Sequence, residues 1–98
     1  MTIKQLKNIS ISQFESFLEL AHCKFIKSEK GHAKYTRSDL NRPVIFQNHI
    51  DPIPEFIIKN TLRLFPYNKD DFYDILEERK VVERINEKTY QLVDHKKK

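Results

Sequence analysis

The chain contains a single glycine among its 98 residues, so the backbone is expected to need Gly31 where it stands. Gly31 ends the segment Glu29-Lys30-Gly31, the only turn signal in the chain that includes a glycine. Short segments of alternating apolar and polar residues flank this turn, at 23–28 and 32–37. This arrangement predicts two strands joined by a tight turn.

Hydrophobic periodicity places further elements around this pair of strands. The predicted order is a helix at 12–21, strands at 23–28, 32–37 and 42–46, a helix at 54–65 and a third helix that follows Asn68. Ser12 and Glu15 have the spacing of a capping box at the start of the first helix. Asn68 is a favourable N-cap for the third helix.

The segment after the third helix is ambiguous. Residues 80–85 and 89–93 are rich in β-branched and aromatic residues and flank a polar turn, which favours a small hairpin. A helix that continues through Val82 and Ile85 is the alternative. Neither an internal repeat nor a domain boundary is visible, so residues 1–98 are expected to form a single domain.

The predicted order defines an α+β fold with an α-β-β-β-α core, the layout of the double-stranded-RNA-binding fold. An antiparallel three-stranded sheet would carry helices on one face and leave the other open to solvent. Alternation along 32–37 then directs Ala33 and Tyr35 toward the helices and places His32, Lys34 and Thr36 on the open face. Tyr35 is expected in the core, with a base-stacking surface as the alternative.

The charge is distributed unevenly along the chain. The net charge is +4, and residues 1–50 carry all of it, with eight basic against four acidic residues. Residues 51–98 contain ten of each. A basic segment early in the chain favours a polyanionic partner, although the solvated faces of ordinary elements are an equally acceptable explanation.

Other features exclude several classes of protein. The chain has no apolar run near the roughly 20 residues of a membrane helix, and residues 1–10 lack the apolar core of a signal peptide. The single cysteine, Cys23, suits a reducing cytosol and is expected to be a packed thiol. His22 and His95 are expected at the surface. No metal or other cofactor is predicted, because no recognised ligand spacing links the histidines to Cys23.

One run of residues supports a more specific interpretation. The segment Lys30-Gly31-His32-Ala33-Lys34-Tyr35 is followed by His49, by Ile53-Pro54 and by Thr61-Leu62-Arg63. In order and spacing this pattern resembles the HicA family of bacterial toxin ribonucleases. The resemblance covers residues 10–76, and residues 77–98 form a C-terminal extension beyond it.

The resemblance implies a double-stranded-RNA-binding-like fold, cleavage of mRNA without a metal, and neutralisation by a HicB-type antitoxin protein. It also implies that His32 is the catalytic residue. Histidine suits that role because its unperturbed pKa of about 6.5 allows proton transfer near neutral pH. The residues expected to bind RNA beside it are Lys30, Gly31, Lys34, Arg37 and His49. For His49, the alternative role is to cap the loop before the second helix.

Two other functions remain open at this point. A module of the same fold would bind structured RNA through its basic residues without cleaving it. A protein-interaction domain would instead use the acidic helix around 70–78 and the C-terminal hairpin. The sequence does not specify an oligomeric state.

Overall fold

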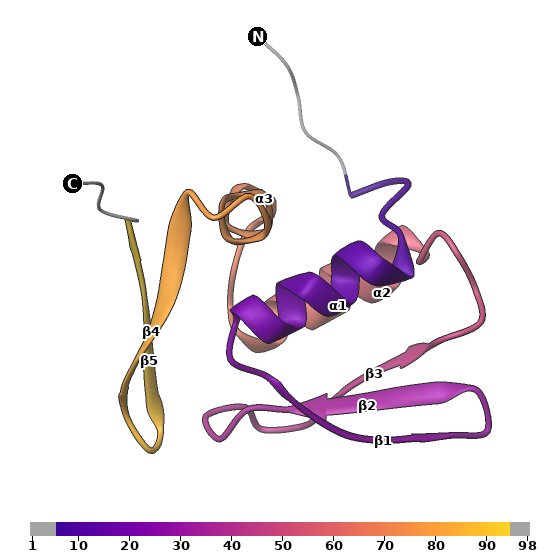
Figure 1. Ribbon diagram of the computed structural model, residues 1–98, viewed down its shortest axis with the longest axis horizontal. Coiled ribbons are helices and arrows are strands. Elements are labelled where there is room, and N and C mark those ends of the chain that lie inside the picture. The colour runs from indigo at the N-terminus through magenta and orange to yellow at the C-terminus, as the bar shows by residue number, and fades with distance from the viewer. Residues whose placement is uncertain (1–5, 95–98) are drawn as a thin grey trace, which may run out of the picture.

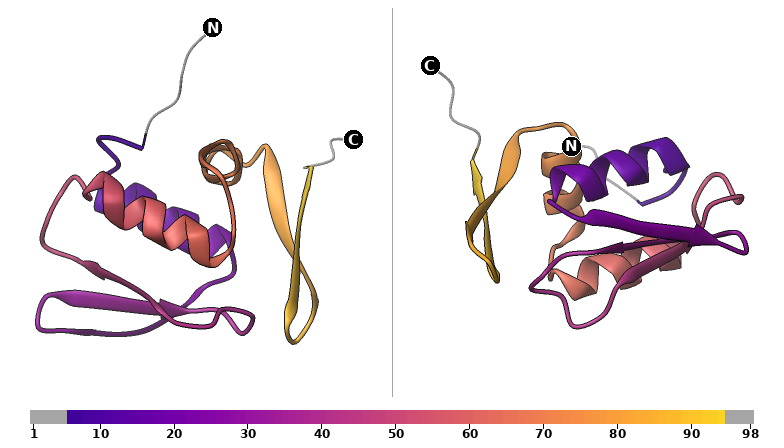
Figure 2. Two further views of the ribbon diagram at one scale, coloured as in Figure 1. Left: turned by 180° about the vertical axis from the view of Figure 1, so that it is seen from behind. Right: turned by 60° about the horizontal axis from the view of Figure 1, so that its bottom comes forward.

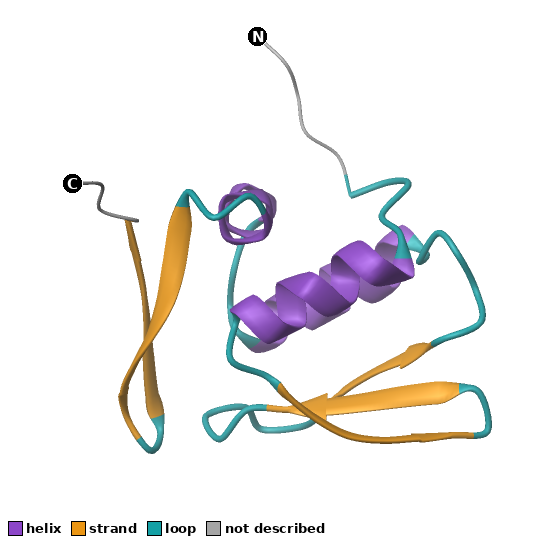
Figure 3. Cartoon of the chain, in the orientation of Figure 1, coloured by secondary structure: helices purple, strands orange, loops and turns teal. Residues whose placement is uncertain are grey.

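The computed structural model describes residues 6–94, which form three helices and five strands (Figures 1 and 3). The elements are α1 (Ile11–Leu20), β1 (Lys24–Glu29), β2 (His32–Thr36), β3 (Val44–Gln47), α2 (Glu55–Leu64), α3 (Lys69–Leu76), β4 (Lys80–Asn86) and β5 (Thr89–Asp94). The predicted α+β class and the order of elements are confirmed, with boundaries shifted by one or two residues. His95 and the final lysines lie outside the described residues.

The start of α1 differs from the prediction. The cap is Ser10, whose hydroxyl accepts from the Gln13 amide at 3.0 Å, while the Gln13 side chain accepts from the Ser10 amide at 2.9 Å. The proposed Ser12–Glu15 box is therefore wrong, because glutamine completes the same reciprocal pair two residues earlier. Asn68 caps α3 as predicted, paired with Asp71.

The three-stranded sheet is antiparallel, with β2 between β1 and β3. Two residues, Lys30 and Gly31, join β1 to β2, and their φ angles are +54° and +81°. Positive φ at both positions is the pattern of a type I′ turn, whose twist matches that of the flanking strands. Most other residues would be strained at this position, whereas glycine adopts a positive φ without strain.

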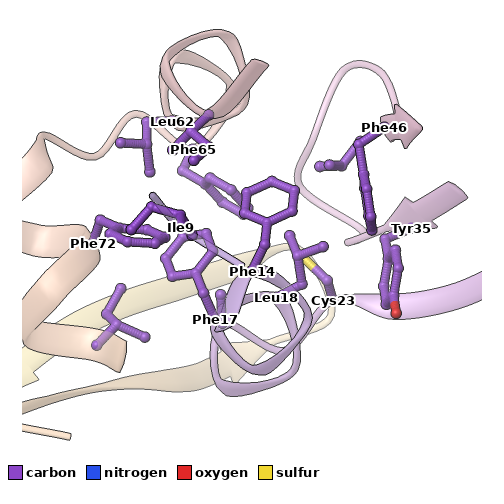
Figure 4. Packing of buried hydrophobic residues seen from close by; sticks show 14 of the residues in the cluster. Ile9, Phe14, Phe17, Leu18, Cys23, Tyr35, Phe46, Leu62, Phe65 and Phe72 are labelled. Carbon is purple, nitrogen blue, oxygen red and sulfur yellow. The ribbon is translucent and has the colours of Figure 1, made fainter. Parts of the chain in front are cut away.

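Both α1 and α2 cover the same face of this sheet, and the other face is open (Figures 1 and 2). The core lies between the layers and combines aliphatic side chains with packed aromatic rings, of which Phe14 and Phe46 have centroids 5.0 Å apart (Figure 4). Ala33 and Tyr35 are buried against the helices, as alternation along β2 predicts. The prediction that Tyr35 lies in the core is confirmed. The side chains on the opposite face of β2 are the ones that can contact a ligand.

The third strand begins at Val44 and not at residue 42. Pro43 has no N–H to donate to β2, so regular pairing starts one residue later, where Val44 lies opposite Tyr35. The sheet continues only as far as Gln47, which pairs with His32 beside the β1–β2 turn. The loop that follows β3 therefore emerges next to that turn.

Strands β4 and β5 form a separate two-stranded sheet, so the hairpin prediction is confirmed and the helical alternative is wrong. The hairpin stands at one end of the three-stranded sheet, beyond α3 (Figures 1 and 2). Val82 of β4 is buried, and the His22 ring donates from Nε2 to the Val82 carbonyl at 2.5 Å. The Ser38 hydroxyl donates to the Glu87 carbonyl. His22 is exposed, as expected, but it also helps to dock the hairpin.

Candidate active site

A shallow pocket of about 250 Å³ lies on the open face of the sheet, near the β1–β2 turn. We call it the turn pocket, and it is lined by Lys27, Glu29, His32, Lys34 and Ile45. It contains the histidine and one of the lysines that the sequence singled out. The pocket also contains a carboxylate and a second lysine that were not predicted as site residues.

Strand register explains why these side chains meet. Glu29 lies opposite His32, and Lys34 lies between Lys27 on β1 and Ile45 on β3. Residues directly opposite each other in a ladder project to the same face of the sheet, so three strands contribute to one pocket. The prediction that His32 and Lys34 share the open face is confirmed, because their neighbours Ala33 and Tyr35 are buried.

The His32 ring is exposed and is held from one side. Its Nδ1 lies 3.2 Å from the carbonyl oxygen of Lys30 in the turn. Because a carbonyl can only accept, Nδ1 carries the proton of this hydrogen bond. Nε2 remains available to exchange a proton with a bound molecule. The turn thus orients the ring and also leaves one nitrogen free for chemistry.

Glu29 is the main addition to the predicted site. Its carboxylate pairs with the Lys27 ammonium at 2.9 Å, and the Lys27 hydrogen bond is the chief cause that lowers the pKa of Glu29. The carboxylate is therefore ionised at neutral pH. The sequence did contain a signal for this residue, because a two-residue turn at Lys30-Gly31 requires Glu29 to face His32 across the ladder.

Lys34 differs from Lys27 in its partners. It is half-buried in the pocket, and within residues 6–94 none of the ion pairs involves its ammonium group. The Lys34 charge does help to lower the pKa of Glu29, but its ammonium group forms no close ion pair there and can bind an anion with less competition than Lys27. Lys34 is consequently the pocket's best candidate for contact with a phosphate group.

The remaining predicted residues at this end lie around the turn and do not line the pocket. Lys30 is exposed at the first turn position. The His49 ring stands against Gly31, since a Cβ built there would meet His49 Nδ1 at 3.0 Å. The loop that carries His49 is fastened to the turn because the Asn48 amide donates to the Gly31 carbonyl at 2.9 Å. Gly31 therefore brings His49 and His32 to the same end of the sheet.

Replacement of Gly31 with alanine is expected to destabilise the fold. The positive φ at this position costs a residue with a side chain about 1–2 kcal/mol, and the new methyl group would push the His49 ring aside. Urea unfolding measures the change in stability. In a His49→Ala background the same substitution should lower stability only by the cost of the positive φ, because the His49 ring is no longer there to be displaced. Equal stability of Gly31→Ala and the parent chain would contradict the turn geometry.

Arg37 requires a correction, because the structure makes it part of the core. Only 4% of its surface is exposed, and its guanidinium group pairs with Asp39 through two hydrogen bonds of 2.6 and 2.9 Å. Its Nη1 donates to the Ala21 carbonyl at 2.9 Å, and the Tyr90 ring lies 4.3 Å from the guanidinium carbon. Because its surface is covered and its donors are committed to Asp39 and Ala21, we assign Arg37 a structural role.

The expected packed thiol at Cys23 is confirmed. Cys23 is 9% exposed, and burial raises the pKa of its thiol to about 12. Because the thiolate is the nucleophilic form, a protonated and buried thiol is unsuited to covalent catalysis. Within residues 6–94 no group of three or more histidine, cysteine or acidic side chains is arranged to hold a metal ion.

No protein-family model, curated protein or solved structure matches this chain. In the described part of the chain, no helix has the length and apolar character needed to cross a membrane.

Proposed function

We propose that this chain is a metal-independent endoribonuclease whose catalytic residue is His32. The observation that carries the proposal is the turn pocket, in which an oriented imidazole lies with a carboxylate and an ammonium group that lacks an ion-pair partner among residues 6–94. Together these groups can move protons and neutralise charge on a phosphodiester, which are the two requirements of RNA cleavage by the RNA's own 2′-hydroxyl.

The cleavage step follows from these groups. The 2′-oxygen attacks the adjacent phosphorus, an O2′–P bond forms and the P–O5′ bond breaks. Glu29 accepts the proton of the 2′-hydroxyl, and His32 donates a proton from Nε2 to the departing 5′-oxygen. Lys34 neutralises charge that develops on the non-bridging oxygens. The products are a 2′,3′-cyclic phosphate and a 5′-hydroxyl, and DNA is not cleaved because it lacks the nucleophile.

The biological role proposed for the chain is that of the toxin in a type II toxin–antitoxin pair. The α1-β1-β2-β3-α2 order supports this role, because it is compatible with the double-stranded-RNA-binding-like fold that the HicA resemblance implies. On this basis the substrate is mRNA in the cytosol. The inhibitory partner is a HicB-type antitoxin protein that covers the open face of the sheet.

Incubation of the purified chain with RNA in excess EDTA tests the reaction class. We expect RNA fragments that end in 2′,3′-cyclic phosphate, while DNA of the same sequence stays intact. An RNA with a single 2′-deoxy substitution at the cleaved position should also stay intact. Stable binding of RNA without fragments would contradict catalysis and identify the chain as an RNA-binding module.

A further inference from the structure

We propose a second phosphate-binding site in the cleft between the three-stranded sheet and the C-terminal hairpin. This hairpin pocket has a volume of about 350 Å³, and it is lined by His22, Lys24, Thr36, Arg37, Ser38, Arg84 and Tyr90. The Arg37 guanidinium group at its wall is already paired with Asp39, so the two cations available to a ligand are Lys24 and Arg84. We infer that it holds a phosphate of the same RNA strand whose cleaved bond lies in the turn pocket. The inference rests on the proposed function and adds to it a role for the C-terminal extension.

Each sheet contributes one cation to this pocket. Lys24 lies opposite Thr36 at the end of the β1–β2 ladder, and Arg84 lies opposite Tyr90 in the hairpin. Arg84 follows buried Val82 by two residues, so both project to the hairpin face that is turned toward the rest of the protein. The pocket therefore exists only because the hairpin docks against the end of the sheet.

The charges in the hairpin pocket favour an anion. Within residues 6–94 neither Lys24 nor Arg84 belongs to an ion pair, and the only hydrogen bond of the Arg84 guanidinium group there joins its Nε to the Asn86 carbonyl. The nearby carboxylate of Asp39 is already neutralised by Arg37. The Thr36 and Tyr90 hydroxyls add neutral donors. Two cations beside hydroxyl groups are the chemistry that recognises phosphate oxygens.

Both pockets are lined in part by residues of β2. His32, Lys34 and Thr36 alternate along β2 on the open face; the first two line the turn pocket and Thr36 lines the hairpin pocket. From His32 to Thr36 the strand spans about 13 Å, so one nucleotide cannot contact both pockets. An RNA strand whose cleaved phosphate lies beside His32 can thus follow β2 and place a more distant phosphate of the same strand between Lys24 and Arg84.

The test measures RNA binding in the His32→Ala chain, so that the probe is not cut. Fluorescence anisotropy with a labelled RNA of about six nucleotides gives the affinity as salt is varied. Lys24→Gln and Arg84→Gln are each expected to weaken binding by up to about fivefold. The two together should reduce the slope of log affinity against log salt by about 0.7 for each phosphate that is no longer neutralised. Arg63→Gln is the matched control, because it removes one exposed charge from α2 on the helical side of the sheet.

Probe length and free phosphate distinguish the source of the bound group. A labelled dinucleotide is too short to reach both pockets, so its affinity should not change in either variant. If inorganic phosphate alone occupies the hairpin pocket and the six-nucleotide RNA binds both variants like the parent, the RNA path along β2 is wrong. Unchanged RNA binding in Lys24→Gln and Arg84→Gln, with RNA cleavage intact in the unmodified chain, overturns the second site and leaves the proposed function standing. Absence of any RNA binding overturns both.

Discussion

Replacement of His32 with alanine is expected to lower the rate of RNA cleavage by a factor of about 10²–10⁴, the range that a positioned general acid or base contributes. RNA affinity should change little, because Lys34 and the other cations remain. The rate is measured under single-turnover conditions in EDTA with a labelled RNA. A lower cleavage rate with unchanged RNA affinity would identify His32 as a residue that acts on the reacting atoms.

The size of this effect has a structural reason. The hydrogen bond from Nδ1 to the Lys30 carbonyl, at 3.2 Å, holds the ring and leaves Nε2 outside this contact. No other group that lines the turn pocket can supply the missing proton to the leaving oxygen as readily at neutral pH.

Two variants give the His32 result its controls. His49→Ala removes an exposed imidazole from the same end of the sheet and is expected to leave the rate within a few-fold of the parent, because His49 does not line the turn pocket. Glu29→Gln should slow cleavage, because the amide cannot accept the proton of the 2′-hydroxyl. Equal cleavage by His32→Ala and the unmodified chain would eliminate His32 from the mechanism.

Replacement of Arg37 with alanine is expected to destabilise the protein by about 3–5 kcal/mol, the cost of breaking a buried ion pair by removal of one partner. Asp39 would keep its charge without a counter-ion, and the Ala21 carbonyl and Tyr67 hydroxyl would lose hydrogen bonds of 2.9 and 3.2 Å. Urea or thermal unfolding of the full chain measures the change. A destabilisation this large would unfold a substantial fraction of the molecules.

The buried setting of Arg37 is the physical cause of this cost. Burial opposes its charge, but hydrogen bonds to Asp39 and Tyr67 outweigh that effect and raise the pKa of the guanidinium group. Arg37 also stacks on Tyr90 and so helps to join the C-terminal hairpin to the sheet. The matched control is Arg42→Ala, an exposed arginine whose removal should change stability by less than about 0.5 kcal/mol. Similar small effects of both substitutions would contradict the structural role of Arg37.

Local patterns were sufficient to predict most of the elements. Helix periodicity, the Asn68 cap and the single glycine identified α1, α2, α3 and the β1–β2 turn, because these depend on residues close together in the chain. The cap of α1 was misassigned because two overlapping Ser-x-x-Glu/Gln patterns occur, at Ser10 and Ser12. Only the backbone of the folded chain selects Ser10, which has the extended φ and ψ of a cap.

The sequence by itself determined which residues share the open face of β2. Period-two alternation separates His32 and Lys34 from Ala33 and Tyr35 whatever the rest of the chain does. The tertiary structure alone decided what surrounds them. It paired Glu29 with His32 across the ladder, buried Arg37 among Asp39, Tyr67 and Tyr90, and closed a second basic pocket against the hairpin. The reason is physical: alternation is set by neighbouring residues, whereas an ion pair or a pocket depends on residues far apart in sequence that only the folded core brings together.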